Sequence, residues 1–132
     1  MALHLQINNI MKKNIVLLDD DLMSLRSLEH ILKEWGYNTA SYSEYNQAFK
    51  EHNFEQVSCV IVDYHLQGDN GISVLQSLKT VNPNISRLLI SGYNINENIL
   101  SQNKSCFDFF LPKPINITKL NIILKKTNKE EK

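Results

Sequence analysis

Carboxylate side chains directly follow two apolar runs of this chain. Residues 14–21 read NIVLLDDD, and a later run, VSCVIVD, ends in Asp63. Carboxylates that are held ~4 Å apart repel one another by roughly 4 kcal/mol at an effective dielectric constant near 20. A proton or a cation must relieve that repulsion. Because no Cys or His cluster accompanies Asp19, Asp20 and Asp63, the hard oxygen ligands favour Mg²⁺ over zinc.

A hydroxyl and an ammonium group follow two further apolar runs. Ser91 comes directly after residues 88–90, and Lys113 follows residues 107–111. A site with Mg²⁺, an ammonium and a hydroxyl is suited to hold a phosphoryl group. Aspartate can act as a nucleophile and form an aspartyl phosphate. Asp63 is the best candidate for that role, because it alone ends its apolar run and a Gly-containing loop follows it.

Each of these features, taken alone, has an ordinary structural explanation. A run of acids is usually a solvated turn or the start of a helix, and a single Asp after a strand usually caps a helix. Ser91-Gly92 is most often a turn, and Lys113-Pro114 by itself carries almost no information. The order of the four features along the chain is what favours a shared site.

The apolar runs predict the strands that would bring these residues together. Residues 15–18, 57–62 and 88–90 are dense in Val, Ile and Leu and do not alternate with polar residues. That pattern is typical of parallel strands that are buried on both faces. Residues 107–111 predict another strand, and the alternating residues 38–42 predict an edge strand.

Helical periodicity appears between the predicted strands. Apolar stripes cover residues 22–35, 72–81 and 117–124, and fainter ones cover 44–51 and 97–102. The resulting five β-α units predict an α/β domain with a doubly wound, five-stranded parallel sheet and helices on both faces. Ligands of such sheets bind beyond the carboxyl ends of the strands. We therefore expect the predicted site residues to converge there: Asp19, Asp20, Asp63, Ser91 and Lys113.

Composition limits the remaining possibilities. The chain has 132 residues, a formal net charge of +0 and 42% hydrophobic residues, which suits one domain with a real core. The balanced charge gives no broad attraction to nucleic acid or to a membrane surface. The N-terminus reads as neither a signal peptide nor a membrane span, so we expect a cytoplasmic protein. Cys59 and Cys106 lie in apolar runs and are expected to be buried free thiols.

Four short motifs, VLLDDD, IVDYHLQGDNG, LLISGY and FFLPKP, occur in that order and resemble the response-regulator receiver domain of bacterial two-component signalling. The resemblance covers residues 14–126, with 1–13 as an N-terminal extension and 127–132 as a solvated tail. It implies a CheY-like, flavodoxin-like sheet with strand order 2-1-3-4-5. It also implies a role for each acid. Asp63 matches the phosphoacceptor, Asp20 a direct Mg²⁺ ligand and Asp19 a ligand acting mainly through water.

The same resemblance implies roles for residues around the acids. The backbone carbonyl of His65 matches a further Mg²⁺ ligand, and Ser91 and Lys113 match the hydroxyl and ammonium that contact the phosphoryl group. The Lys113–Pro114 peptide bond is expected to be cis. Phe110 occupies the switch-aromatic position, where Tyr is commoner. The His65 imidazole has two readings: it either orients water and shortens the lifetime of the acyl phosphate, or points to solvent.

The function implied by the resemblance is phosphoryl transfer to Asp63 from the phosphohistidine of a histidine kinase or phosphotransfer protein. Phosphorylation would switch an interaction face for an unknown output protein or domain, with a phosphorylation-dependent homodimer as one form of that response. Such a domain is not a conventional turnover enzyme. One alternative is a degenerate receiver that only binds partners. Another is a Mg²⁺-dependent phosphatase, but those enzymes place a second Asp two residues after the nucleophile, where this chain has His65.

Overall fold

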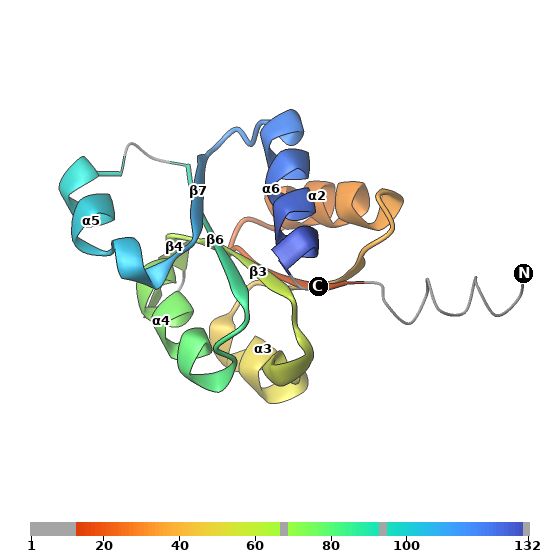
Figure 1. The fold of residues 1–132 in the computed structure, drawn as a ribbon, viewed down its shortest axis with the longest axis horizontal. Coiled ribbons are helices and arrows are strands. Elements are labelled where there is room, and N and C mark those ends of the chain that lie inside the picture. Colours follow the sequence, from red (N-terminus) through yellow and green to blue (C-terminus); the bar gives the residue numbers. More distant parts are fainter. Residues whose placement is uncertain (1–12, 67–68, 93–94, 131–132) are drawn as a thin grey trace, which may run out of the picture.

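The computed structural model describes residues 13–66, 69–92 and 95–130 of the chain (Figure 1). The predicted N-terminal extension therefore lies outside the described residues except for Lys13. The described part is an α/β domain with one parallel sheet between two layers of helices. No helix in this described part is both long and apolar enough to cross a membrane.

The central sheet has five parallel strands. Their spatial order is β2-β1-β3-β6-β7, which is the predicted order 2-1-3-4-5 once the strands of this sheet are counted along the chain. The third strand begins two residues later than predicted, because Val57 closes a 3-10 turn by donating its N–H to the carbonyl of Phe54. The strands are β1 (Asn14–Leu18), β2 (Asn38–Tyr42), β3 (Cys59–Asp63), β6 (Ser86–Ser91) and β7 (Phe109–Pro112).

The helices lie where the sequence periodicity predicts them. They are α2 (Leu22–Glu34), α3 (Tyr45–Glu51), α4 (Gly71–Val81), α5 (Glu97–Gln102) and α6 (Ile117–Glu130). Helix α2 ends just before Gly36, which has a φ of 96° and adopts the left-handed conformation that glycine tolerates best. Helix α4 is capped by Asn70, whose side chain accepts from the Ser73 N–H.

Four short elements were not predicted. A two-residue strand, β4 (His65–Leu66), pairs antiparallel with another, β5 (Asp69–Asn70), directly after β3. Two 3-10 turns, η1 (Phe54–Gln56) and η2 (Lys104–Cys106), precede β3 and β7. Elements of two or three residues are too short to show a repeating pattern of apolar residues, so the sequence does not predict them.

The hydrophobic core consists of two clusters, one on each face of the sheet. Helices α2 and α6 cover one face, and α3, α4 and α5 cover the other (Figure 1). Alternate residues of β1 supply the two clusters: Ile15 and Leu17 face α2 and α6, whereas Val16 and Leu18 face the opposite layer. The central strands are thus buried on both sides, which explains their unbroken apolar runs.

The two cysteines are buried thiols that form no disulfide with each other, as predicted. Cys59 belongs to the cluster beneath α2 and α6, and Cys106 belongs to the cluster on the other face. The sheet therefore separates the two thiols. They act as small apolar side chains in the core.

The C-terminal tail predicted to begin at residue 127 is corrected at its first position. Helix α6 continues to Glu130, and Thr127 is 4% exposed. The Thr127 hydroxyl donates to the carbonyl of Leu124 at 2.7 Å, so its polar group is satisfied within the helix. Thr127 therefore belongs to the packed domain rather than to a solvated tail.

Candidate functional site

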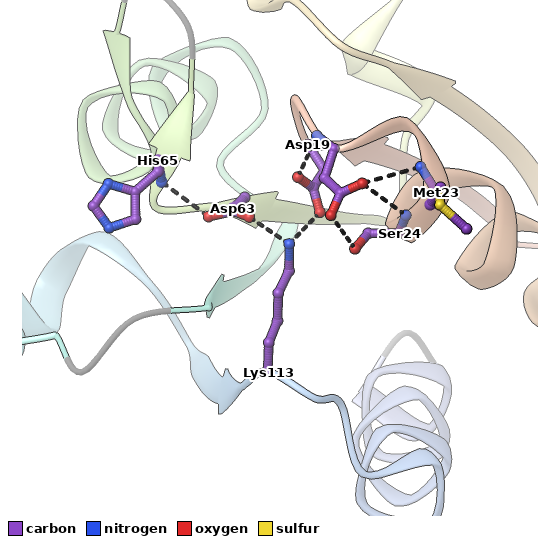
Figure 2. A network of polar contacts seen from close by, with 7 residues as sticks. Asp19, Met23, Ser24, Asp63, His65 and Lys113 are labelled. Carbon is purple, nitrogen blue, oxygen red and sulfur yellow. Dashed lines mark hydrogen bonds and ion pairs between the residues drawn. The ribbon is translucent and has the colours of Figure 1, made fainter.

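The acidic residues meet because the strands that carry them are neighbours. Strands β1 and β3 pair in parallel, with Leu18 opposite Val62. The next residues along each strand, Asp19 and Asp63, consequently leave the sheet side by side at its carboxyl edge (Figure 2). Both are buried, at 3% and 4% exposed. The convergence expected from the order of the motifs is therefore present for these two acids.

Lys113 joins the two buried carboxylates. Its Nζ donates to Asp19 Oδ2 and to Asp63 Oδ2, each at 2.6 Å (Figure 2). The backbone of Lys113 is held to β6 by a hydrogen bond from its N–H to the Ser91 carbonyl at 2.8 Å. The Lys113–Pro114 peptide bond is cis, as the resemblance implied. One ammonium thus bridges acids that lie 94 and 50 residues away in the chain.

The second oxygen of each buried acid accepts a backbone hydrogen bond. Asp19 Oδ1 accepts from the Asp21 N–H, and Asp63 Oδ1 accepts from the His65 N–H, both at 2.9 Å. Each carboxylate is therefore held at both oxygens, with one contact from its own loop and one from Lys113. This arrangement fixes the orientation of the Asp63 side chain before any ligand arrives.

A third acid completes a group that fits a divalent cation. Asp20 is exposed, and ligand oxygens of Asp19, Asp20 and Asp63 all lie within 4.8 Å of one another. With the one ammonium of Lys113, the three carboxylates leave two negative charges uncompensated. Only hard oxygen donors are present in this group, and Mg²⁺ prefers such donors and keeps several waters of its own. The donor set therefore fits the Mg²⁺ predicted from the sequence.

Burial and charge act against each other in the pKa values of this site. Burial raises the pKa of the Asp19 carboxyl, although hydrogen bonds from Lys113 and from the Asp21 backbone act in the opposite direction. Burial alone would lower the pKa of Lys113, but its hydrogen bonds to Asp19 and Asp63 outweigh that effect and raise it. The two directions agree physically, because one ammonium is shared by two buried acids and cannot neutralise both.

Asp21, the third acid of the DDD run, has a different role. Its carboxylate caps helix α2 by accepting from the backbone N–H groups of Met23 and Ser24 and from the Ser24 hydroxyl. The hydrogen bonds from Ser24 lower the pKa of the Asp21 carboxyl. The run therefore divides into two residues at the cation site and one helix cap.

The two predicted switch residues, Ser91 and Phe110, lie on β6 and β7 of the central sheet. Ser91 is fully buried at the end of β6, one residue after Ile90, which pairs with Asp63. Phe110 is half-buried on β7, where it pairs with Leu89 and packs against the core cluster under α3, α4 and α5. Ser91 therefore lies on the strand next to that of Asp63, and Phe110 lies one strand further away.

The His65 imidazole does not point into the acidic group. The side chain is exposed and extends away from the Asp63 carboxylate and Lys113 (Figure 2). Its ring packs edge-on against the ring of Tyr64, with centroids 4.8 Å apart. Of the two readings left open by the sequence, this placement favours the solvent-facing one.

Mg²⁺ should stabilise the protein through the acidic group. At one hundred times its dissociation constant, a ligand of the folded state raises the free energy of unfolding by about 2.7 kcal/mol. We expect a melting-temperature increase of roughly 10 °C with saturating Mg²⁺, measured by calorimetry. Asp20→Asn should remove most of this shift at little cost in metal-free stability, because Asp20 is exposed.

The control for this measurement is Glu55→Gln. Glu55 is an exposed acid in η1, which precedes β3 and therefore lies at the opposite end of the sheet. The Glu55→Gln protein should show the full Mg²⁺ shift. An equal shift in the wild-type and Asp20→Asn proteins would show that Mg²⁺ does not use this acidic group.

Comparison with known proteins identifies relatives over most of the chain. The family model described as response regulator receiver domain matches residues 15–125. The "Transcriptional regulatory protein ZraR" of Escherichia coli (strain K12) is 28% identical over 113 residues, which cover 86% of this chain and 26% of that protein. The "Putative response regulator NtrX-like" of Rickettsia typhi is 36% identical over 114 residues, covering 84% and 24%. The chain thus spans about a quarter of the length of these relatives.

Solved structures share the same fold. A response regulator protein from Burkholderia pseudomallei, crystallised with a phosphorylated aspartic acid, a calcium ion and citrate, superposes with a TM-score of 0.78 at 26% identity. The superposition covers 90% of this chain and 70% of that one. The signal receiver domain of an HD domain-containing protein from Pseudomonas fluorescens Pf-5 superposes with a TM-score of 0.81 at 21% identity, covering 91% and 89%.

Proposed function

The chain belongs to the response regulator receiver domain family, and on that premise we propose that Asp63 is the phosphoacceptor of a two-component phosphorelay. The observation that carries this proposal is the bridging of Asp63 and Asp19 by the Lys113 ammonium. It places a cation and a carboxylate nucleophile in direct contact beside two further acids. The related structure from Burkholderia pseudomallei carries a phosphorylated aspartic acid and a calcium ion, which supports the same chemistry here.

In the proposed reaction, an Asp63 carboxylate oxygen forms a bond to phosphorus. The bond between phosphorus and the phosphohistidine nitrogen of a histidine kinase or phosphotransfer protein breaks, and the imidazole leaves. Lys113 then pairs with an oxygen of the phosphoryl group instead of with Asp63 alone. Slow hydrolysis of the aspartyl phosphate returns the domain to its starting state, so the chain is not a conventional turnover enzyme.

Asp19, Asp20 and Asp63, with the backbone carbonyl of His65, would hold Mg²⁺ at this site. When bound, Mg²⁺ supplies positive charge that offsets the charge developing on the transferring phosphoryl group. The chain contributes the orientation: the backbone N–H of His65 and the Lys113 ammonium hold the two oxygens of Asp63. The reactive carboxylate therefore needs little reorganisation.

We propose that phosphorylation switches the face formed by α5 and β7. A phosphoryl group adds nearly two negative charges at the carboxyl edge of the sheet. The Ser91 hydroxyl, at the end of the adjacent strand, would donate a hydrogen bond to a phosphoryl oxygen. Helix α5 has no buried residue, so it is less firmly packed than α4, which has five. A shift of Ser91 and rotation of the half-buried Phe110 would change this face and the partner it binds.

The lengths of the relatives bear on which partner binds this face. The relatives named transcriptional regulatory proteins are about four times as long as the matching segment, so most of each relative lies outside the region that matches this chain. For this chain we propose either an output domain or output protein, or a second copy of the domain, as the partner of the switched face, acting in the cytoplasm. Direct contact with nucleic acid is not part of the proposal, because the formal net charge is +0.

The alternative is a degenerate receiver that binds partners without phosphorylation. Incubation of the protein with acetyl phosphate and Mg²⁺, followed by intact-mass measurement, separates the two. We expect the mass of one phosphoryl group with Mg²⁺ and none when the metal is chelated. An unchanged mass with Mg²⁺ would favour the binding module. The phosphatase alternative remains disfavoured, because His65 stands where those enzymes have a second Asp.

Substitution of His65 should leave the lifetime of the phosphorylated protein almost unchanged. The imidazole is exposed and points away from Asp63, and surface substitutions of this kind usually change free energies by less than about 0.5 kcal/mol. The half-life of phosphorylated His65→Ala should therefore stay within about twofold of the wild-type value, by the same 0.5 kcal/mol. A several-fold longer half-life would show instead that the imidazole orients the attacking water.

A further inference from the structure

We infer that Gly71, the first residue of α4, is a positioning residue for the phosphoacceptor. The inference deepens the proposed function and rests on it where Mg²⁺ and phosphorylation are concerned. Because Gly71 has no side chain, α4 can approach the backbone of Asp63 closely. This close approach would fix the position of the acceptor and of the backbone that follows it. The helical periodicity of residues 72–81 predicted a helix that begins close to Gly71, and it assigned no role to this glycine.

The evidence is the space around the Gly71 α-carbon. A β-carbon added there would lie 2.9 Å from the carbonyl carbon of Asp63 and 2.9 Å from the α-carbon of Tyr64, and it would lie closer still to the carbonyl oxygen of Asp63. Real β-carbons essentially never come that close to other atoms, and all three atoms belong to the backbone. No side-chain rotation can relieve the overlap, so the helix or the acceptor must move.

The acceptor's backbone is fixed on its other side by the sheet. Asp63 pairs with Ile90 on β6, and the next residue, Tyr64, donates its N–H to the Ile90 carbonyl at 2.7 Å. On the helix side, the Gly71 N–H donates to the Tyr64 carbonyl at 2.8 Å. The peptide that follows the acceptor is thus held between β6 and the first residue of α4.

The same hydrogen bond lies next to the backbone of His65. His65 of β4 pairs antiparallel with Asn70 of β5, the residue before Gly71. Gly71 therefore joins this pair of short strands to the Asp63–Tyr64 backbone. Because the His65 N–H donates to Asp63 Oδ1 at 2.9 Å, a displacement at Gly71 would alter both the carboxylate orientation and the position of the His65 carbonyl.

Gly71→Ala tests this inference directly. We expect Mg²⁺ binding, measured by calorimetric titration, to weaken about tenfold or more, and phosphorylation by acetyl phosphate to slow by about 10–100-fold, as for other positioning residues. A third measurement needs no metal. Hydrogen exchange of the His65 amide should speed up in Gly71→Ala, because its bond to Asp63 Oδ1 is lost or weakened.

The matched control is Leu78→Ala. Leu78 is fully buried on the same helix, two turns beyond Gly71, so its truncation loosens α4 without adding an atom near Asp63. At temperatures where both proteins are fully folded, Leu78→Ala should keep wild-type Mg²⁺ affinity and wild-type exchange at His65. Equal losses in the two variants would show that Gly71 acts only through stability, and the inference would be overturned.

A second pair of variants covers the case in which Gly71→Ala does not fold. Asn70→Ala removes the cap that holds the first turn of α4, and Asn96→Ala removes the equivalent cap of α5. We expect Asn70→Ala to weaken Mg²⁺ binding and to speed exchange of the His65 amide, whereas Asn96→Ala should change neither. Identical behaviour of the two cap variants would contradict the role of the α4 start.

Failure of this inference and failure of the proposed function give different results. If wild-type protein neither binds Mg²⁺ nor takes up a phosphoryl group, the proposed function fails. The metal-free exchange of the His65 amide would still decide whether Gly71 positions the acceptor. If wild-type protein does both and Gly71→Ala does them equally well, only the inference about Gly71 fails.

Discussion

Asp63→Asn should abolish phosphorylation by acetyl phosphate in the presence of Mg²⁺. An amide oxygen of Asn is a poor nucleophile, and this variant also removes one of the three acids of the cation group. The two oxygens of Asp63 are held by the His65 N–H and by Lys113, so the carboxylate is oriented before attack. We expect no phosphorylated species by intact-mass measurement under conditions in which wild-type protein is fully labelled.

The matched control for Asp63→Asn is Asp21→Asn. Asp21 lies next to the site but caps α2, and Asn caps a helix about as well as Asp does. The Asp21→Asn protein should be labelled at nearly the wild-type rate. Labelling of Asp63→Asn at a wild-type rate would place the acceptor elsewhere, and loss of labelling in Asp21→Asn would mean that the third acid of the run takes part in the chemistry.

Lys113→Met should strongly destabilise the metal-free protein. The substitution leaves Asp19 and Asp63 buried without their shared cation, and removal of one partner of a buried ion pair costs about 3–5 kcal/mol. Lys113 is 18% exposed, so we expect a value near the lower end of that range in urea unfolding at pH 7. Mg²⁺ should stabilise Lys113→Met more than wild type, because no ammonium competes for the two carboxylates.

The pH dependence of this loss follows from the pKa directions. The pKa of Asp19 is raised in the folded state, so folding favours its protonated form. The stability that this protonation contributes is complete below the ordinary carboxyl pKa and is lost as pH rises through the raised value. The stability gap between Lys113→Met and wild type should therefore shrink at acidic pH. Lys113 also has a raised pKa, so its contribution in wild type is complete at neutral pH and is lost only as pH rises through that raised value.

Two further variants check the physical cause. Lys50→Met changes an exposed lysine on α3 and should alter the free energy of unfolding by less than about 0.5 kcal/mol. Adding Asp19→Asn to Lys113→Met should restore part of the lost stability, because it removes one of the unpaired charges. If the double variant were less stable than Lys113→Met, charge repulsion between the acids would not be the reason for the loss.

The sequence by itself determined the architecture. Unbroken apolar runs marked β1, β3 and β6 as strands buried on both faces, and the change to helical periodicity between them required parallel strands with crossover helices. Those two local patterns sufficed to predict the carboxyl edge as the place of the site, whereas the strand order was implied by the family resemblance. The predicted residues Asp19, Asp63 and Lys113 are in contact there.

Local patterns were insufficient where a residue's role depends on what another segment brings to it. The DDD run gave no means of separating Asp21, a helix cap, from Asp19 and Asp20 at the cation site. Thr127 reads as part of a polar tail, yet it is buried where α6 packs on the domain.

Only the tertiary structure decided the contacts that prepare the acceptor. Periodicity reports which face of an element is buried, but the distance between side chains on different elements depends on strand register and on the path of each loop. The bridge from Lys113 to two acids, the outward direction of His65 and the close approach of Gly71 to Asp63 all arise at such distances. The packing of separate elements sets these distances and directions, and no pattern along the chain encodes them.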